Sequence, residues 1–335
     1  MHTKLKTSVF AIILLSTLMI SQPAFAATPY SAIDLGTLGG SFSFAQDIND
    51  RGQVTGYSSN ALGEFHAFLW ENSKMTDLGT LGGTFSFGAA LNARGQVAGF
   101  SITATGDQHA VLWNKGVMTD LGTLGGNFSS ASGINARGQI VGFSTNLSNN
   151  NRAFLWENGK MADLGTLGGA FSLASNINAR GQIAGWSETA SGEVHAFLWD
   201  KGVMTDLGTL GGPTSIGSSL NAPGKLVGES DVNSLVRHAF LWASGTMSDL
   251  GTLGGVNSSA SGINAHGQVV GDSDTASGDR HAFVWENGAL TDLGTLGGSN
   301  SFALAINDGG IIVGLSSNAK GEFHATLWKK FVSYP

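Results

Sequence analysis

Three residue types that can form a hydrolytic triad recur together along this chain. The first group is Asp34, Ser43 and His66, and similar groups follow at intervals of 43 residues. A Ser-His-Asp triad activates the serine hydroxyl for attack on a carbonyl carbon. An enzyme needs one such triad at one site, whereas here the trio is copied along the chain. We therefore predict that the trio, together with Trp70, forms a repeated structural network that satisfies buried polar groups.

The histidines do not predict a metal site either. They lie 43 residues apart in separate repeats, whereas a metal ion needs three or four ligands within about 2–2.6 Å. The chain has no cysteine, which excludes disulfides, thiolate catalysis and cysteine-ligated zinc. The glycine-rich segment Gly36–Gly40 lacks the spacing and the helix of a dinucleotide-binding loop. We expect no metal and no cofactor.

A sequence repeat must position these residues. The segment DLGTLGG occurs seven times, and a tryptophan follows each copy at the same offset. The seven copies begin at Asp34, Asp77, Asp120, Asp163, Asp206, Asp249 and Asp292. Self-similarity at this period is typical of solenoids and propellers. Because no linker or change in composition interrupts the copies, we expect one domain over residues 27–335.

Each repeat contains four segments with the character of strands. The first three are Ser41–Asn49, Gln53–Ser58 and His66–Trp70, and the fourth is clearest at Lys160–Leu164. Four antiparallel strands with a glycine-rich crossover describe a propeller blade. The sequence therefore predicts an all-β chain folded as a seven-bladed β-propeller of four-stranded 43-residue repeats. A β-solenoid is the alternative.

The turns and the strand count indicate how the ring would close. Asn49–Gly52 fits a type I turn with glycine in the left-handed position, and Asn158–Gly159 favours a type I′ hairpin. The seventh fourth strand is supplied at the front, by Tyr30–Leu35. We expect it to pair with His324–Trp328. The tail Lys329–Pro335 departs from the repeat and is interpreted as a competing or supplementary outer strand.

The third strand carries a recognisable tripeptide. His-Ala-Phe before Leu-Trp, as in His66–Trp70, resembles the signature of the HAF-family extracellular repeat proteins, and the resemblance covers residues 34–328. The departures are His109-Ala110-Val111, Asn151-Arg152-Ala153-Phe154 and His324-Ala325-Thr326. The resemblance implies an exported repeat protein and no particular activity. Arg152 can donate a hydrogen bond from the histidine position, which suits a structural role.

Residues 1–26 have the pattern of a secretory signal. A basic start precedes the apolar run Val9–Ile20, and Ala24–Ala26 forms an A-x-A cleavage site. An uncleaved membrane anchor is the alternative. Removal of the two lysines in this segment takes the formal net charge from −7 to −9, which argues against nucleic-acid binding. We expect a secreted (extracellular or periplasmic) monomer whose mature chain has no membrane span.

Comparison of the repeats shows two positions that change together. The residue before the second-strand serine and the residue before the third-strand histidine are mainly apolar in units one to four. Units five and six carry an acid and a base instead, Glu229 with Arg237 and Asp272 with Arg280. We predict that each pair faces across adjacent strands, an interaction that contributes about 0.2–1 kcal/mol.

The innermost strand carries a second asymmetry. Phenylalanine occupies one position in units one to four, and Thr214, Asn257 and Asn300 occupy it in units five to seven. We predict that a ligand bound at the axis contacts these three polar side chains. The alternative is that they line a wetter stretch of the channel.

The function predicted from these features is a non-enzymatic, exported binding or scaffold protein. The reason is that no set of residues in the sequence looks like a catalytic constellation present in a single copy. Its partner could be a glycan, a cell-wall polymer or a protein. The first alternative is a hydrolase or lyase that acts on an extracellular polymer through carboxylates at the loop face. The second is a purely structural surface or matrix protein.

Overall fold

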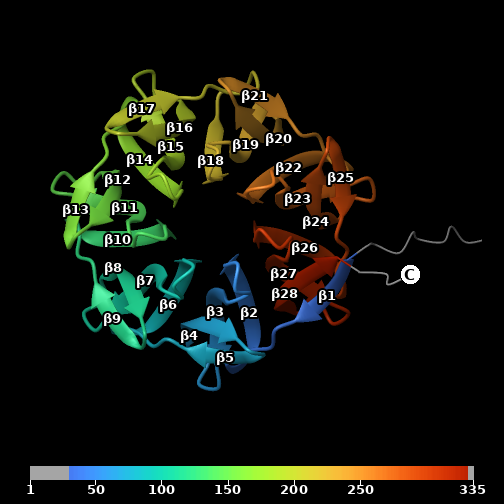
Figure 1. The fold of residues 1–335 in the computed structure, drawn as a ribbon, viewed down its shortest axis with the longest axis horizontal. Coiled ribbons are helices and arrows are strands. Elements are labelled where there is room, and N and C mark those ends of the chain that lie inside the picture. The colour runs from blue at the N-terminus through green and yellow to red at the C-terminus, as the bar shows by residue number, and fades with distance from the viewer. Residues whose placement is uncertain (1–29, 331–335) are drawn as a thin grey trace, which may run out of the picture.

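The computed structural model describes residues 30–330, which form 28 strands and contain no helix. Sets of four antiparallel strands follow one another around a common centre, with the first strand of each set innermost (Figure 1). The predicted all-β, propeller-like architecture is confirmed. The predicted signal segment and the last five residues of the tail lie outside the described residues. No helix in the described part is long and apolar enough to cross a bilayer.

The strands fall into four positions within the sets. The innermost strands are β2 (Gly39–Ile48), β6 (Gly82–Leu91), β10 (Gly125–Ile134), β14 (Gly168–Ile177), β18 (Ser215–Leu220), β22 (Gly254–Ile263) and β26 (Gly297–Ile306). The second strands are β3 (Val54–Asn60), β7 (Val97–Thr103), β11 (Ile140–Asn146), β15 (Ile183–Thr189), β19 (Leu226–Asn233), β23 (Val269–Thr275) and β27 (Ile312–Asn318). The third strands are β4 (Phe65–Glu71), β8 (Gln108–Asn114), β12 (Asn151–Glu157), β16 (Val194–Asp200), β20 (Val236–Ala243), β24 (Arg280–Glu286) and β28 (Phe323–Lys330). The outermost strands are β5 (Lys74–Asp77), β9 (Val117–Asp120), β13 (Lys160–Asp163), β17 (Val203–Asp206), β21 (Thr246–Asp249), β25 (Ala289–Asp292) and β1 (Tyr30–Asp34).

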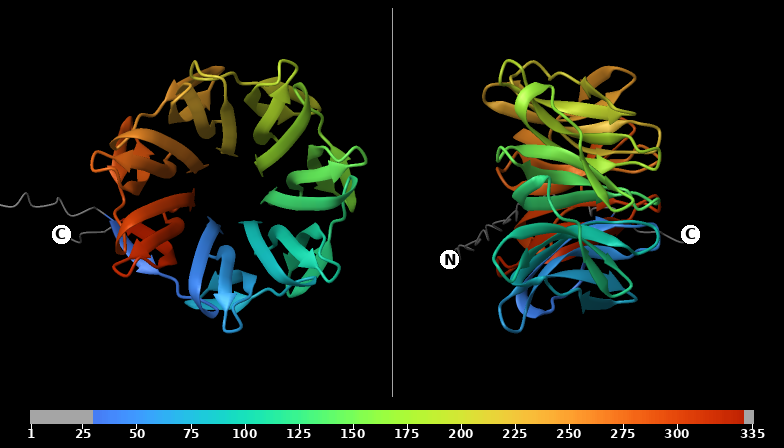
Figure 2. Two further views of the ribbon diagram at one scale, coloured as in Figure 1. Left: turned by 180° about the vertical axis from the view of Figure 1, so that it is seen from behind. Right: turned by 90° about the vertical axis from the view of Figure 1, so that its left-hand side faces the viewer.

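The turns have the backbone conformations that their sequences predict. Gly52 ends the first turn with a φ of 75°, in the left-handed region that glycine adopts without strain. Asn158 and Gly159 have φ values of 53° and 78°, as a type I′ hairpin requires. Figure 2 shows connections between strands at both faces of the molecule. We call the face with the Asn49–Gly52 type of turn the turn face and the opposite one the loop face.

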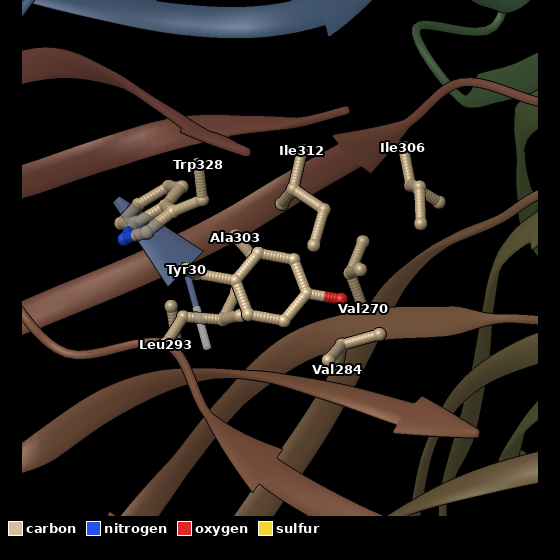
Figure 3. Close-up of a cluster of buried hydrophobic side chains, with 9 residues drawn as sticks. Tyr30, Val270, Val284, Leu293, Ala303, Ile306, Ile312 and Trp328 are labelled. Atoms are coloured by element: carbon tan, nitrogen blue, oxygen red, sulfur yellow. The ribbon is translucent and has the colours of Figure 1, made fainter. Parts of the chain in front are cut away.

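The first strand of the described chain pairs with the last. β1 runs antiparallel to β28, from Tyr30 opposite Lys330 to Asp34 opposite Thr326. Tyr30 is buried against Trp328 and Leu293, as Figure 3 shows. Residues 329 and 330 continue β28, so the beginning of the tail extends a third strand. The outermost place beside β28 belongs to β1, which corrects the interpretation of that part of the tail as a separate outer strand.

A chain of side-chain hydrogen bonds links the sets near the centre. An asparagine before each turn donates through Nδ2 to the carbonyl oxygen of its counterpart in the next unit, at 3.0–3.2 Å. The seven are Asn49, Asn92, Asn135, Asn178, Asn221, Asn264 and Asn307. The last bond of the series runs from Asn307 to Asn49 at 3.1 Å. Each side-chain amide therefore links its unit to the next one, and the last bond of the series links the last unit to the first.

The hydrophobic core lies between neighbouring sets of strands. One cluster joins Ile48, Val54 and Phe68 of the first unit to Val313 and Leu327 of the last. Equivalent clusters recur between successive units. Because each unit buries its apolar surface only against its neighbours, its stability depends on both of them.

Candidate functional site

The repeated histidines pair with aspartates on the outermost strands. His66 Nδ1 lies 2.8 Å from Asp77 on β5, which pairs with β4. The same contact joins His109 to Asp120, His195 to Asp206, His238 to Asp249, His281 to Asp292 and His324 to Asp34. Arg152 takes the histidine's place and donates from Nε to Asp163 at 3.1 Å. Each contact holds the third and fourth strands of one set together.

This pairing corrects the predicted grouping of Asp34 with His66. Asp34 belongs to β1 and contacts His324, because the DLG segment of each repeat forms the outermost strand of the preceding set. The carboxylates are also about two-fifths exposed, 44% for Asp34, so these acceptors are not the buried ones expected for the network. Hydrogen bonding to Asp292 raises the pKa of His281, although burial opposes the shift.

The repeated inner-strand serines bond to the backbone. Ser43 Oγ donates to the Gly36 carbonyl at 2.6 Å and accepts the amide hydrogen of Ala325 at 3.0 Å. Among the described residues, no hydrogen bond joins one of these serines to a histidine. Trp70 packs at the edge of the first core cluster. The serine, the histidine–aspartate pair and the tryptophan therefore act as three separate structural contacts, and no triad forms.

Ser86→Ala should destabilise the fold by about 2–3 kcal/mol, because it leaves one buried and one partly buried backbone group without a partner. Ser86 Oγ donates to the Gly79 carbonyl at 2.7 Å and accepts from the Ala67 amide at 2.9 Å. Chemical denaturation measures the change. Ser41→Ala, at an exposed position of the first inner strand, is the control and should have little effect. Equal stability of the two variants would contradict the assignment.

The centre of the molecule contains a polar channel. Two overlapping cavities of about 210 and 320 Å³ share one residue from each innermost strand. These residues are Gln46, Ala89, Ser132, Ser175, Ser218, Ser261 and Leu304. Each is the extra residue of a β-bulge, as between Ala45 and Asp47. A bulge bends its strand and redirects side chains, which explains why this position lines the channel.

The structure places the three residues predicted to contact an axial ligand away from this channel. Thr214, Asn257 and Asn300 do not line either cavity. They lie four residues before the bulge, at the loop-face end of the innermost strand, next to the third strand of the preceding unit. An innermost strand presents its edge to the centre, so regular side chains point toward neighbouring units. Period-two alternation contains no signal that identifies the bulged residue.

One carboxylate lines the channel. Asp47 accepts hydrogen bonds from the amides of Ile48 and of Leu91 in the next unit, both at 2.8 Å. Burial raises its pKa to about 7, against the lowering effect of these two donors. The other units carry Ala90, Gly133, Asn176, Ser219, Gly262 and Ala305 at this position. Asp47 is the one ionisable side chain among the residues lining the two cavities.

The predicted charge pairs lie on shared faces of their sheets. Arg237 Nη1 donates to Glu229 Oε1 at 2.8 Å, and Arg280 Nε donates to Asp272. The residue directly opposite Arg237 is Asp231, with Nε to Oδ1 at 2.9 Å, and Asp274 is opposite Arg280. The two pairs are therefore diagonal, because each predicted acid lies two residues along its strand from the residue directly opposite the arginine. Sequence comparison missed the second acid beside each arginine, Asp231 and Asp274. Both were visible as a difference between repeats, because units one, three and seven have serine or threonine at this position.

Comparison with known proteins supports the fold and goes no further. No protein-family model matches the chain, and no curated protein matches it. Solved structures do. The β-propeller domain of the trilobed protease from Pyrococcus furiosus is 9% identical with a TM-score of 0.54, and the match covers 87% of this chain and 96% of that one.

Two further matches are to parts of longer chains. A Mycobacterium tuberculosis puromycin-hydrolysing peptidase is 11% identical with a TM-score of 0.54, over 82% of this chain and 48% of that one. TolB from Acinetobacter baumannii is 12% identical with a TM-score of 0.49, over 87% and 65%. The chain thus spans about two thirds of TolB and half of the peptidase. At these identities the likeness shows an all-β propeller fold alone.

Proposed function

We propose that this chain is an exported, non-enzymatic binding module of the HAF-repeat type, built as a closed seven-bladed propeller. The pairing of β1 with β28 and the asparagine bond from the last unit to the first support closure. The signal-like residues 1–26 and the His-Ala-Phe repeats support export and family. Closure would leave no unpaired sheet edge at the seam and would give a rigid frame for a central site.

The polar channel carries the proposal of binding. Its walls bear hydroxyls from four serines of the bulge ring, the carboxamides of Gln46 and Asn176, and the Asp47 carboxylate. Six of the seven residues of this ring are small or polar, with Leu304 as the exception, and the ring borders a cavity of about 210 Å³. A small polar molecule with several hydrogen-bond donors fits this lining, because such sites fix a ligand through a few placed polar groups.

The arrangement favours binding over catalysis. Hydrolysis of a polymer typically needs two carboxylates in acid and base roles. Asp47 has a pKa of about 7, suitable for proton transfer, yet neither a second carboxylate nor a histidine lines the same cavities. Serine hydroxyls in the channel therefore lack a general base other than Asp47 itself. A scaffold role would leave the channel unused.

A thermal-shift screen tests this function. The mature chain is challenged with monosaccharides, amino sugars, amino acids and polyamines, and each compound is then analysed for turnover. The Ser175→Leu, Ser218→Leu double variant serves as the blocked channel, because Leu304 already occupies this ring in the seventh unit. Stabilisation of the wild-type chain, lost in the double variant and without turnover, is the expected result. Turnover would support the enzyme alternative, and stabilisation retained in the blocked variant would exclude the channel.

A further inference from the structure

The junction between consecutive units at the loop face, which we call the slot, contains aromatic side chains in one place and polar side chains in another. At the loop face, the beginning of each third strand meets the beginning of the next innermost strand, as where Phe65 pairs with Phe85. Between units one and two the slot is aromatic. The Tyr57 ring lies 5.9 Å from Phe65 and 5.8 Å from Phe85, between ring centroids. Such contacts stabilise the junction by packing.

Between units five and six the equivalent positions are polar. Glu229 replaces Tyr57, Arg237 replaces Phe65 and Asn257 replaces Phe85. The structure has a cavity of about 460 Å³ here, lined by these three residues with Asp231 and Arg280, and by Leu235 and Val236. The exchange therefore produces a hollow on the loop face.

The polar groups of this hollow are held in fixed positions. Arg237 donates from Nε to Asp231 and from Nη1 to Glu229. Asn257 Oδ1 accepts the Arg237 amide at 3.2 Å, and its Nδ2 donates to Asp274 at 3.0 Å. Arg280 forms ion pairs with Asp272 and Asp274, and its Nη1 lies 3.6 Å from Asp274 Oδ1. The rotamers are thus set before a ligand arrives, which lowers the entropic cost of binding.

Charge selects the class of ligand. In the lining, Glu229 and Asp231 balance the charges of Arg237 and Arg280, so a cation and an anion would each lose hydration without a net electrostatic attraction in return. A neutral ligand that both donates and accepts hydrogen bonds avoids this penalty. Planar guanidinium, carboxylate and carboxamide groups can each bond two adjacent hydroxyls. Leu235 is 86% exposed beside them and offers apolar contact for the C–H face of a sugar ring.

We propose that the hollow between units five and six binds a neutral saccharide through adjacent hydroxyl groups. The site is separate from the central channel and does not depend on a ligand there. It places the saccharide on the loop face, where a polymer chain could continue past the hollow.

A swap between units tests the proposal. The Glu229→Tyr, Arg237→Phe double variant recreates the Tyr57 and Phe65 pair of the first unit, so the chain itself shows that the slot accepts these side chains. The probes are neutral cello-, manno- and galacto-oligosaccharides and anionic oligogalacturonate, measured by isothermal titration calorimetry. We expect wild-type protein to bind at least one neutral probe and the double variant to lose at least about tenfold in affinity.

Two controls and one substitute variant separate the outcomes. Tyr57→Phe, in the aromatic slot, should leave affinity unchanged, and so should the blocked-channel variant Ser175→Leu, Ser218→Leu. If the double variant does not fold, Arg237→Gln replaces it, and the same loss is expected. Three results would each overturn the proposal: no neutral probe binds, oligogalacturonate is preferred, or folded slot variants bind as tightly as the wild-type chain. None of these results would contradict the separate proposal of a binding site in the channel.

Discussion

Deletion of residues 30–35 should lower the melting temperature by about 10 °C or more, because a loss of at least about 5 kcal/mol converts at about 2 °C per kcal/mol. The deletion removes five residue pairs between β1 and β28. It also removes Tyr30 and Leu35, which are 6% and 7% exposed. Each side chain contributes about 1.5–3 kcal/mol by burial, and each lost hydrogen bond about 1 kcal/mol.

Differential scanning calorimetry measures the change in melting temperature. The deleted chain lacks only residues 30–35 and retains the residues before them. Ile33→Ser is the matched control. Ile33 belongs to the same strand but is 46% exposed, so its replacement keeps the backbone pairing and should change the melting temperature little. A synthetic peptide of residues 30–36, added in excess, should restore part of the loss. An unchanged melting temperature in the deletion would show that β1 does not stabilise the last set.

Asp47→Asn should remove a pH-dependent loss of stability. Burial raises the pKa of Asp47 from 3.8 to about 7. Between these values the folded chain retains a proton that the unfolded chain has released, so the free energy of unfolding falls as pH rises. At about 1.4 kcal/mol per pKa unit, the wild-type chain loses about 2–4 kcal/mol by about pH 8. Asparagine does not titrate and so avoids this pH-dependent loss, although its Nδ2 cannot accept either of the two amide hydrogens that the carboxylate oxygens accept.

Denaturant unfolding at about pH 5 and about pH 8 compares the two chains, with other titrating groups common to both. The variant lacks one of the two acceptor oxygens at every pH, so the test is the change with pH: the stability of the wild-type chain should fall from the lower to the higher pH more than that of the variant. Asn176→Asp provides the reciprocal test, because Asn176 occupies the position equivalent to Asp47 in the fourth unit, directly after the bulge. This variant should acquire the pH dependence. Parallel pH profiles for all three chains would contradict a raised pKa at Asp47.

Local chemistry explains what could be predicted from the sequence. The 43-residue period, the Asn158–Gly159 turn and the strand near His66–Trp70 each depend on residues close together in the chain. Turn conformation follows from the ability of glycine and asparagine to adopt positive φ. The front strand Tyr30–Leu35 was also recognisable, because its sequence matches the fourth strand that is missing from the last repeat, whereas the tail Lys329–Pro335 departs from the repeat.

The functional surfaces could not be found in this way. A bulge adds one residue without a change in composition, so neither Gln46 nor Ser175 differs in sequence character from a regular strand residue. The partner of His66 depends on which set the DLG segment joins, and that is a matter of strand pairing. The asparagine series was visible as a repeat, but its donors and acceptors are neighbours only when the units stand side by side.

The sequence by itself determined the strands, their turns and the repeat. It also showed that Glu229 and Arg237 replace the aromatic residues found at these positions in the first unit. Only the tertiary structure decided that this exchange opens a hollow and that the centre is lined by bulged residues. The physical reason is that propensity and periodicity act over a few residues, whereas a cavity is defined by side chains from units 43 or more residues apart. Their packing, and the room left between them, exists only after the units have assembled.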